Sequence, residues 1–122
     1  MPCAGVNSPK GRNENMENYE PKVYISGPMS GRTVEEVYNH FLKAQVKLDK
    51  DGYEPVNPVN VSHLPFSYDE LMEIDLKILS YCDGIYMLKG WKDSFGAQME
   101  LQYAVMKQHF IMYEDESEAV EC

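Results

Sequence analysis

The stretch DGIYMLKGWKDSFGAQME, Asp83–Glu100, decides which fold the sequence predicts. It begins with a short apolar run, residues 85–88, that is typical of a buried strand. A loop follows, and a helical pattern starts near Gly96. The positions that share one face of that helix are Ala97, Leu101, Ala104, Val105 and Gln108. A buried strand that leads into a helix with one apolar face is the building unit of α/β proteins.

Two acids near this stretch have both a functional and a structural explanation. Glu100 falls in the first turns of the helix, beyond the carboxyl end of the strand, where ligands bind in open parallel sheets. An acid in a first helical turn is also favoured by the helix dipole alone. Asp75, in the preceding helix, lies at the margin of an apolar stripe, where a carboxylate is often simply solvated. Position alone does not assign either residue.

The same alternation of strand and helix extends to both sides of this stretch. Further strands are predicted at residues 23–25, 53–56 and 110–113. One further helix is predicted from the cap Thr33 to the stop at residues 51–52, and another from Ser67 to an end near residues 81–84. Short connections between alternating strands and helices favour a parallel sheet with right-handed crossovers. The sequence therefore predicts an α/β three-layer sandwich. Its parallel sheet is Rossmann-like or flavodoxin-like, with four strands in the order 2-1-3-4 and helices on both faces.

Local signals place the ends of the predicted helices. Thr33 with Glu36, and Ser67 with Glu70, have the spacing of a capping box. Gly52 follows the first helix, where a left-handed residue commonly ends it. In the second helix the residues expected to face inward are Leu71, Ile74, Ile78 and Leu79.

Length and composition restrict the class of protein. The 122 residues suit one domain, residues 21–114, with a flexible N-terminal arm at 1–20 and an acidic tail at 115–122. A net charge of −9 argues against binding to a nucleic-acid polymer. The three cysteines form no disulfide framework and no metal-binding spacing, and no apolar run is long enough to cross a membrane. We therefore expect a cytoplasmic protein with no metal, no other cofactor and no membrane partner.

Two connections are expected at the carboxyl edge of the sheet. The turn Ser26–Arg32 is rich in Gly and Ser, and such a turn after a strand can direct backbone N–H groups at an anion. It matches neither the dinucleotide-binding nor the P-loop pattern, so an ordinary βα turn remains the alternative. The loop Asn57–Phe66 is long for a crossover, which is typical of a segment that shapes a pocket.

Three segments at this edge carry a resemblance to a known family. They are YISGPMSG at residues 24–31, Asp75, and SFGAQME at residues 94–100. In this order and spacing they resemble the nucleoside 2-deoxyribosyltransferase superfamily over residues 22–113. That superfamily includes 2′-deoxynucleoside 5′-monophosphate N-hydrolases and small, often phage-associated proteins of unassigned function. The resemblance implies cleavage, by hydrolysis or transfer, of the N-glycosidic bond of a nucleoside 5′-monophosphate.

The resemblance also implies roles for the matching residues. Glu100 would attack C1′ of the sugar, Asp75 would orient it or give a proton to the departing base, and Tyr24 would position the nucleophile. Ser94 stands where the transferases have Asp and the monophosphate hydrolases have Ser, which favours a nucleotide over a nucleoside. The predicted substrate-binding residues are Ser26, Gly27, Met29, Ser30, Gly31, Arg32, Trp91, Ser94 and Gly96. Trp91 either stacks on the base or packs in the interior.

The residue types suit this chemistry independently of the resemblance. Breaking an N-glycosidic bond develops positive charge at C1′, which a carboxylate stabilises and can trap as a covalent intermediate. Two carboxyl groups at one site raise the pKa of one of them, so that an acid stands beside an ionised nucleophile.

Two other hypotheses remain open. One is a non-catalytic module that binds or senses a nucleotide in the same pocket. The other is a small interaction protein whose acidic surface meets a basic partner, which predicts that Tyr24, Asp75 and Glu100 lie apart. Apart from that basic partner, the expected partners are a small nucleotide or nucleoside and further copies of the chain, in a homodimer or higher homo-oligomer.

Overall fold

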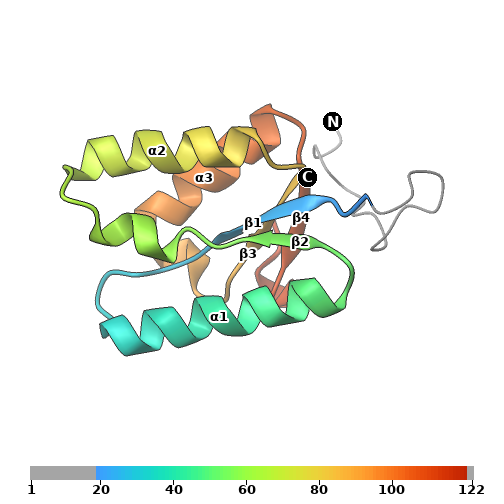
Figure 1. Ribbon diagram of the computed structural model, residues 1–122, viewed down its shortest axis with the longest axis horizontal. Helices are drawn as coiled ribbons and strands as arrows, with labels where there is room; N and C mark the ends of the chain where they lie inside the picture. Colours follow the sequence, from blue (N-terminus) through green and yellow to red (C-terminus); the bar gives the residue numbers. More distant parts are fainter. Residues whose placement is uncertain (1–18, 121–122) are drawn as a thin grey trace.

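The structure is a computed structural model that describes residues 19–120. One parallel sheet contains β1 (Lys22–Ser26), β2 (Glu54–Val56), β3 (Gly84–Met87) and β4 (Phe110–Tyr113). The strand order is β2-β1-β3-β4, which confirms the predicted order. Helix α1 (Val34–Lys50) covers one face, and α2 (Tyr68–Ser80) with α3 (Phe95–Met106) covers the other (Figure 1). The three-layer α/β fold is confirmed as well.

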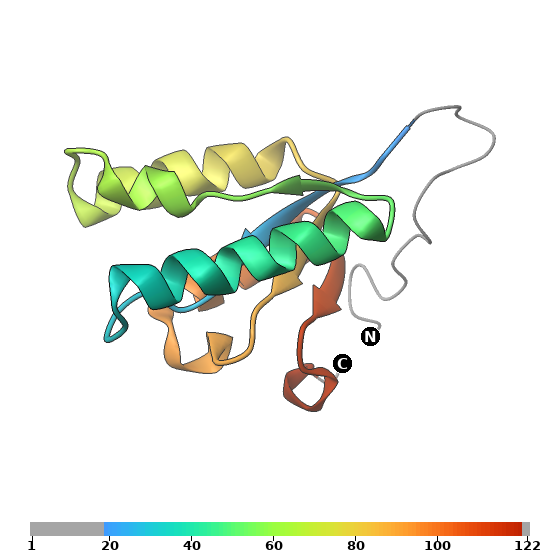
Figure 2. The ribbon, with the colours of Figure 1, turned by 60° about the horizontal axis from the view of Figure 1, so that its bottom comes forward.

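Three short 3₁₀ helices complete the connections: η1 (Val59–His63), η2 (Trp91–Asp93) and η3 (Glu116–Glu118). Figure 2 shows that η3 follows β4 at the C-terminal end of the described chain. Two carboxylates of this region accept hydrogen bonds from the loop after β3. The backbone N–H of Lys89 donates to Oε1 of Glu114 (2.7 Å), and that of Gly90 donates to Oε1 of Glu118 (3.0 Å). The chain after β4 is thereby joined to the loop that leads into α3.

The pleat of β1 divides its side chains between the two layers. Val23 and Ile25 belong to the core cluster on the side of α1, whereas Tyr24 belongs to the cluster formed with α2 and α3. Successive residues of a strand point to opposite faces. Ser26 therefore shares the face of Tyr24, and two polar side chains of the buried central strand point toward α3.

The predicted ends of α1 and α2 are confirmed. Thr33 with Glu36 and Ser67 with Glu70 form capping boxes, in which each side chain accepts a hydrogen bond from the backbone N–H of the other residue. Gly52 follows α1 with a φ of 93°, in the left-handed region that glycine adopts without steric cost.

Two residues predicted on the inner face of α3 lie elsewhere. Val105 is exposed, and Gln108 lies beyond the end of the helix with a φ of 61°. The backbone N–H of His109 donates to the carbonyl of Ala104 and that of Gln108 to the carbonyl of Val105, as in a Schellman motif. The prediction was wrong because this left-handed position is usually glycine, and a glutamine there gives no stop signal.

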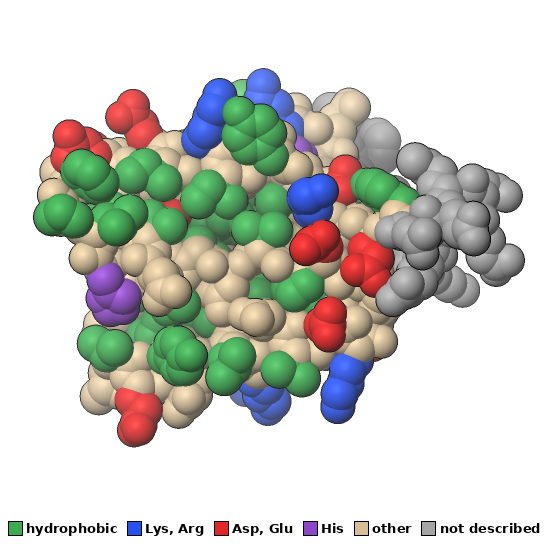
Figure 3. All heavy atoms as spheres, viewed as in Figure 1, with side chains coloured by type: hydrophobic (Ala, Val, Ile, Leu, Met, Phe, Trp, Pro, Cys, Tyr) green, Lys and Arg blue, Asp and Glu red, His purple; other side chains and the backbone are tan. Residues whose placement is uncertain are grey.

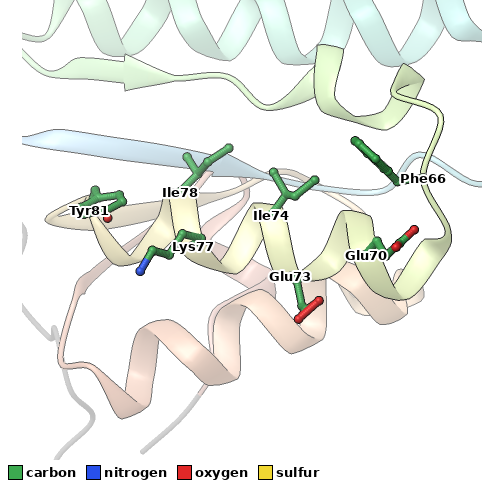
Figure 4. Close-up of a pocket in the computed structure, with 7 residues that line it drawn as sticks. All are labelled: Phe66, Glu70, Glu73, Ile74, Lys77, Ile78 and Tyr81. Atoms are coloured by element: carbon green, nitrogen blue, oxygen red, sulfur yellow. The ribbon is translucent and has the colours of Figure 1, made fainter.

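The inner face of α2 is also less buried than predicted. Leu79 is fully buried, but Ile74 and Ile78 are only half-buried. They line a groove of about 460 Å³ along the outside of α2, together with Phe66 and Tyr81. Figure 4 shows Phe66, Ile74 and Ile78 turned toward the same side of the helix. This part of α2 has no covering element within residues 19–120.

Apolar side chains also gather on the outside of α1. Val34, Tyr38, Leu42 and Val46 recur every four residues and are all exposed. In Figure 3 apolar side chains form one row over α2 and another over α1. Helix α1 therefore carries one apolar stripe in the core and a second at the surface. Within residues 19–120, no helix is both long and apolar enough to cross a lipid bilayer.

Candidate functional site

Glu100 is a buried acid whose two carboxyl oxygens each accept a hydrogen bond from β1. The hydroxyl of Tyr24 donates to Oε2 (2.8 Å), and the hydroxyl of Ser26 donates to Oε1 (2.6 Å). Glu100 is 6% exposed, Tyr24 0% and Ser26 1%. Both donors come from the tyrosine face of the strand, which the pleat of β1 directs at the first turns of α3. The carboxylate therefore has a fixed orientation.

Asp75 brings a second carboxyl group to the same place. It lies on α2 and lines the cavity that Glu100 also lines. Its Oδ1 atom is buried and has no hydrogen-bond partner among the described residues. A buried polar atom without a partner costs about 1–3 kcal/mol, so such an atom needs an explanation. A proton on Asp75, or a donor on a bound ligand, would supply it.

Burial determines the protonation of both acids. It raises the pKa of Glu100 to about 7, and the negative charge of Asp75 adds to the rise, while the hydrogen bonds from Ser26 and Tyr24 oppose it. Burial likewise raises the pKa of Asp75 to about 6. Near neutral pH the two groups therefore exchange protons with solvent as a pair. Perturbed acids in a cavity are typical of functional sites.

The cavity that holds the pair has a volume of about 590 Å³, within the range of small-molecule sites. It opens at the carboxyl ends of β1 and β3, where the order of the strands reverses and where α/β proteins bind ligands. Its polar and apolar lining includes Gly27, Pro28, Met29, Ser30, Pro58, Ser62, Tyr68, Leu71, Met72, Asp93, Ser94, Phe95, Gly96 and Ala97. Among the described lining residues the charged ones are all acids: Asp75, Asp93 and Glu100.

The structure brings most of the predicted site residues together. Those that line the cavity are Tyr24, Gly27, Met29, Ser30, Asp75, Ser94, Gly96 and Glu100. Ser26 reaches the site through its bond to Glu100. The loop Asn57–Phe66 contributes Pro58 and Ser62, which confirms the prediction that this loop shapes a pocket wall. Gly31, Arg32 and Trp91 are not among the lining residues.

Arg32 takes part in a polar chain outside the cavity. Its Nη1 atom lies 3.2 Å from Nδ1 of His40, and Nε2 of His40 lies 2.8 Å from Oε1 of Glu114. Arginine can only donate, so Nδ1 accepts and Nε2 carries the hydrogen that Glu114 accepts. These contacts join the β1–α1 turn to Glu114 after β4, and Arg32 does not line the cavity.

Trp91 is part of the hydrophobic core. Its side chain is 5% exposed and belongs to the cluster on the side of α2 and α3. Its ring packs at a tilt against Tyr113, with 6.2 Å between the ring centroids. Of the two explanations that the sequence left open, the structure shows interior packing.

The cavity also contains residues that the sequence analysis did not single out, notably Tyr68, Met72, Asp93 and Phe95. Tyr68 and Phe95 are the first residues of α2 and α3. Each directly follows a capping serine, Ser67 or Ser94. That pairing was visible in the sequence, and since both helices begin at the carboxyl edge of the sheet, it could have placed these rings at the site.

Two other features do not compete with this cavity. The groove along α2 in Figure 4 is lined by surface side chains. Its charged residues Glu70, Glu73 and Lys77 are exposed to solvent. Among residues 19–120, no group of three or more His, Cys, Asp or Glu side chains is arranged to hold a metal ion.

The hypothesis of a simple interaction protein predicted that Tyr24, Asp75 and Glu100 lie apart. That prediction is wrong, because Tyr24 bonds to Glu100 and Asp75 lines the same cavity. The three side chains meet at one cavity, which two acids line.

Comparison with known families identifies one family model that covers most of the chain. The model of the family described as Domain of unknown function (DUF4406) matches residues 21–113. No curated protein matches the chain. The matched range contains all four strands, α1, α2 and α3, and every residue that lines the cavity. The chain belongs to the DUF4406 family.

Proposed function

We propose that this protein cleaves the N-glycosidic bond of a nucleoside 5′-monophosphate with Glu100 as the nucleophile. The observation that carries the proposal is the position of Glu100. Its two oxygens are held by Tyr24 and Ser26, and it faces a cavity that Asp75 also lines. The proposal agrees with the resemblance of the sequence to the nucleoside 2-deoxyribosyltransferase superfamily.

The chemistry requires one ionised and one protonated carboxyl group. The Glu100 carboxylate attacks C1′, the bond between C1′ and the base nitrogen breaks, and the base leaves with the proton of Asp75. The product is a glycosyl ester on Glu100. Water then attacks C1′ of the ester while the Asp75 carboxylate takes up a proton from that water, which releases the sugar 5-phosphate and restores both groups.

The hydrogen-bond pattern supports this division of roles. Two donors stabilise the Glu100 carboxylate, whereas Oδ1 of Asp75 has no donor among the described residues. Hydrogen bonds to an ionised group favour its charged form. In the free protein the order of the pKa values is the reverse, about 7 for Glu100 and about 6 for Asp75, so the reactive protonation state is the minor one and is favoured only as positive charge develops at C1′.

Hydroxyl groups rather than cations would hold the 5′-phosphate. Ser30 and Ser94 line the cavity, and Ser94 also caps α3 by accepting a hydrogen bond from the N–H of Ala97 (3.2 Å). Its hydroxyl hydrogen remains free to donate to a phosphate oxygen. The first backbone N–H groups of α3 lie next to it, and the N-terminus of a helix favours an anion.

Release of free base is the direct test. The protein is incubated with ribo- and deoxynucleoside monophosphates and with the corresponding nucleosides, and the base is quantified by chromatography between pH 4 and 9. We expect a bell-shaped dependence of kcat/KM with limbs near the two pKa values, about 6 and about 7.

The signs of the two limbs follow from the protons on the pair. Below the acid limb both carboxyl groups are protonated and no nucleophile exists, and above the alkaline limb both are ionised and no proton reaches the base. Asp75→Asn removes the proton donor, so the residual activity of this variant should lose the alkaline limb. If no substrate releases base at any pH, the proposed function is wrong.

A second candidate is a module that binds the nucleotide without cleaving it. The observation that favours it is the pKa of Glu100, because burial keeps much of this group protonated at neutral pH. A protonated acid is a poor nucleophile but a good hydrogen-bond donor. Binding without catalysis predicts that nucleotides raise the melting temperature of both the wild type and Glu100→Gln, with no base released. A nucleotide-induced shift that disappears in Glu100→Gln would count against a simple binding role.

A further inference from the structure

Helix α2 presents a stripe of side chains to the cavity above Asp75. Tyr68, Leu71, Met72 and Asp75 all line the cavity, and their spacing of three to four residues places them on one face of the helix. Asp75 lies at the inner end of this stripe and Tyr68 at the outer end. A group bound next to Asp75 therefore has Met72 one turn away and Tyr68 two turns away on the same wall.

The side chain of Tyr68 reaches across the mouth of the cavity toward α3. A Cβ atom placed on Gly96 would lie 3.3 Å from the hydroxyl oxygen of Tyr68 and 3.3 Å from Cε of Met72. Glycine at position 96 thus leaves room for both side chains over the first turn of α3. Tyr68 and Met72 consequently form an outer wall between the acid pair and solvent.

The ring of Tyr68 is 57% exposed although it lines a cavity. Among residues 19–120, its hydroxyl has no hydrogen-bond partner and its ring has no aromatic or cationic partner. Tyr81, at the opposite end of the same helix, differs: it is 70% exposed and has Nζ of Lys77 at 5.5 Å from its ring centroid. The ring of Tyr81 is thus engaged by Lys77, whereas the ring and hydroxyl of Tyr68 are available at the cavity.

We infer that Tyr68 and Met72 hold the base of the substrate, with the flat heteroaromatic ring packed against this wall and its glycosidic nitrogen directed inward at Asp75. This inference rests on the proposed function, because it uses Asp75 as the proton donor to the departing base. A base that receives a proton from Asp75 has to lie beside Asp75, and the stripe on α2 is the wall that continues outward from it.

The chemistry of the wall suits a base rather than a phosphate. An aromatic ring and a thioether both pack well against a flat heterocycle. The pKa of the Tyr68 hydroxyl is raised, first by burial and then by the negative charges of Glu100, Asp69 and Asp75. The hydroxyl stays protonated and can donate to a ring nitrogen or exocyclic oxygen of the base.

Equilibrium binding separates recognition of the base from recognition of the sugar phosphate. Dissociation constants are measured by calorimetry for four deoxynucleoside monophosphates and, by competition, for 2-deoxyribose 5-phosphate. All proteins carry Glu100→Gln, so that the nucleotides are not cleaved during the measurement: Glu100→Gln alone and combined with Tyr68→Ala, Tyr68→Phe, Met72→Ala or the matched control Tyr81→Ala. Tyr68→Ala is expected to weaken nucleotide binding about tenfold or more, in line with the loss of one stacked ring. Binding of the sugar phosphate should stay within about twofold.

The other variants sharpen the test. Tyr68→Phe keeps the ring and should lose only the part of the affinity that the hydroxyl supplies, and Met72→Ala should weaken nucleotides but not the sugar phosphate. Tyr81→Ala should change neither. Nucleotide affinity unchanged in both Tyr68→Ala and Met72→Ala, or an equal loss for nucleotide and sugar phosphate, would overturn the inference.

The outcome also distinguishes this inference from the proposed function. Base release that is abolished in Glu100→Gln but insensitive to Tyr68 would leave the function standing and remove the base wall. Nucleotide binding that depends on Tyr68, without base release by the wild type, would support the base wall and contradict the proposed function. Failure of the wild type to bind any of the nucleotides would overturn both.

Discussion

Glu100→Gln is expected to abolish base release and, at pH 8, to make the protein more stable than the wild type. Loss of the nucleophile should lower kcat by at least about 10³-fold, since glutamine cannot form the glycosyl ester. The gain in stability arises because glutamine removes a charge that the folded protein buries. The amide has nearly the same shape as the carboxyl group and can still bond to Tyr24 and Ser26.

The sign of the stability change follows from the two pKa values of Glu100. Burial raises the pKa from 4.5 to about 7 in the folded protein. Between these values the folded protein binds more protons than the unfolded chain, so the stability of the wild type falls as the pH rises through this window. Each pKa unit corresponds to about 1.4 kcal/mol, which gives a difference of up to about 3 kcal/mol above pH 7.

Urea unfolding of both proteins at pH 4.5, 6 and 8 measures this difference. The two free energies of unfolding should agree within about 1 kcal/mol at pH 4.5 and separate as the pH rises. Glu73→Gln, at an exposed glutamate of α2, is the matched control and should follow the wild type at all three values. A Glu100→Gln protein less stable than the wild type at pH 8 would mean that the hydrogen bonds to the carboxylate outweigh the cost of burying it.

Gly84→Ala is expected to have the largest effect on folding. Gly84 begins β3, between Val23 of β1 and Phe110 of β4 in the register of the sheet. A Cβ atom there would lie 2.5 Å from Cζ and 2.6 Å from Cδ1 of Phe110, and closer still to Cε1. The ring of Phe110 is itself packed against Tyr53, with 6.1 Å between centroids, so it cannot move aside freely. We expect a loss of about 3 kcal/mol, at the upper end for overpacking of a core.

A double-mutant cycle identifies the cause of this loss. If the clash with Phe110 is responsible, Gly84→Ala should cost much less in a Phe110→Leu background, where the ring is absent. Gly31→Ala serves as the comparison. Gly31 has a φ of 78° but open space around its α-carbon, so that substitution should cost about 1–2 kcal/mol from backbone strain alone. Equal losses from Gly84→Ala in both backgrounds would rule out the packing explanation.

The features that repeat along the chain were the ones that sequence analysis predicted well. Helix bounds depend on the spacing of apolar residues and on caps such as Thr33 and Ser67, which are local signals. The strand order follows from the regular alternation of strands and helices, which restricts the possible crossovers. The approach of Tyr24 and Glu100 was implied by the resemblance, and it agrees with a topology in which a strand end and the helix after the neighbouring strand meet at one edge of a parallel sheet. The pleat of β1 then directs the side chain of Tyr24 at Glu100.

Side chains in connections were harder to predict, because their direction depends on partners far along the chain. Arg32 turns toward His40 and Trp91 packs against Tyr113, and neither partner is adjacent in sequence. Tyr68 differs, because its local sequence signal was visible but was not used. Its ring is exposed in the structure and its position after a capping serine was visible, but only the packing of α2 beside α3 shows that it borders the cavity.

The two hydrogen bonds to Glu100 come from Tyr24 and Ser26, alternate residues of β1 in the interior of the sheet, and not from the loops around the cavity. The interior of the sheet thus fixes the orientation of the Glu100 carboxylate, while the turn after β1, η1 and the start of α2 shape the rest of the cavity. Insertions or substitutions in those outer segments can change which molecules fit the cavity without changing the orientation of the Glu100 carboxylate. The shape of the cavity can therefore change independently of the hydrogen bonds that hold Glu100.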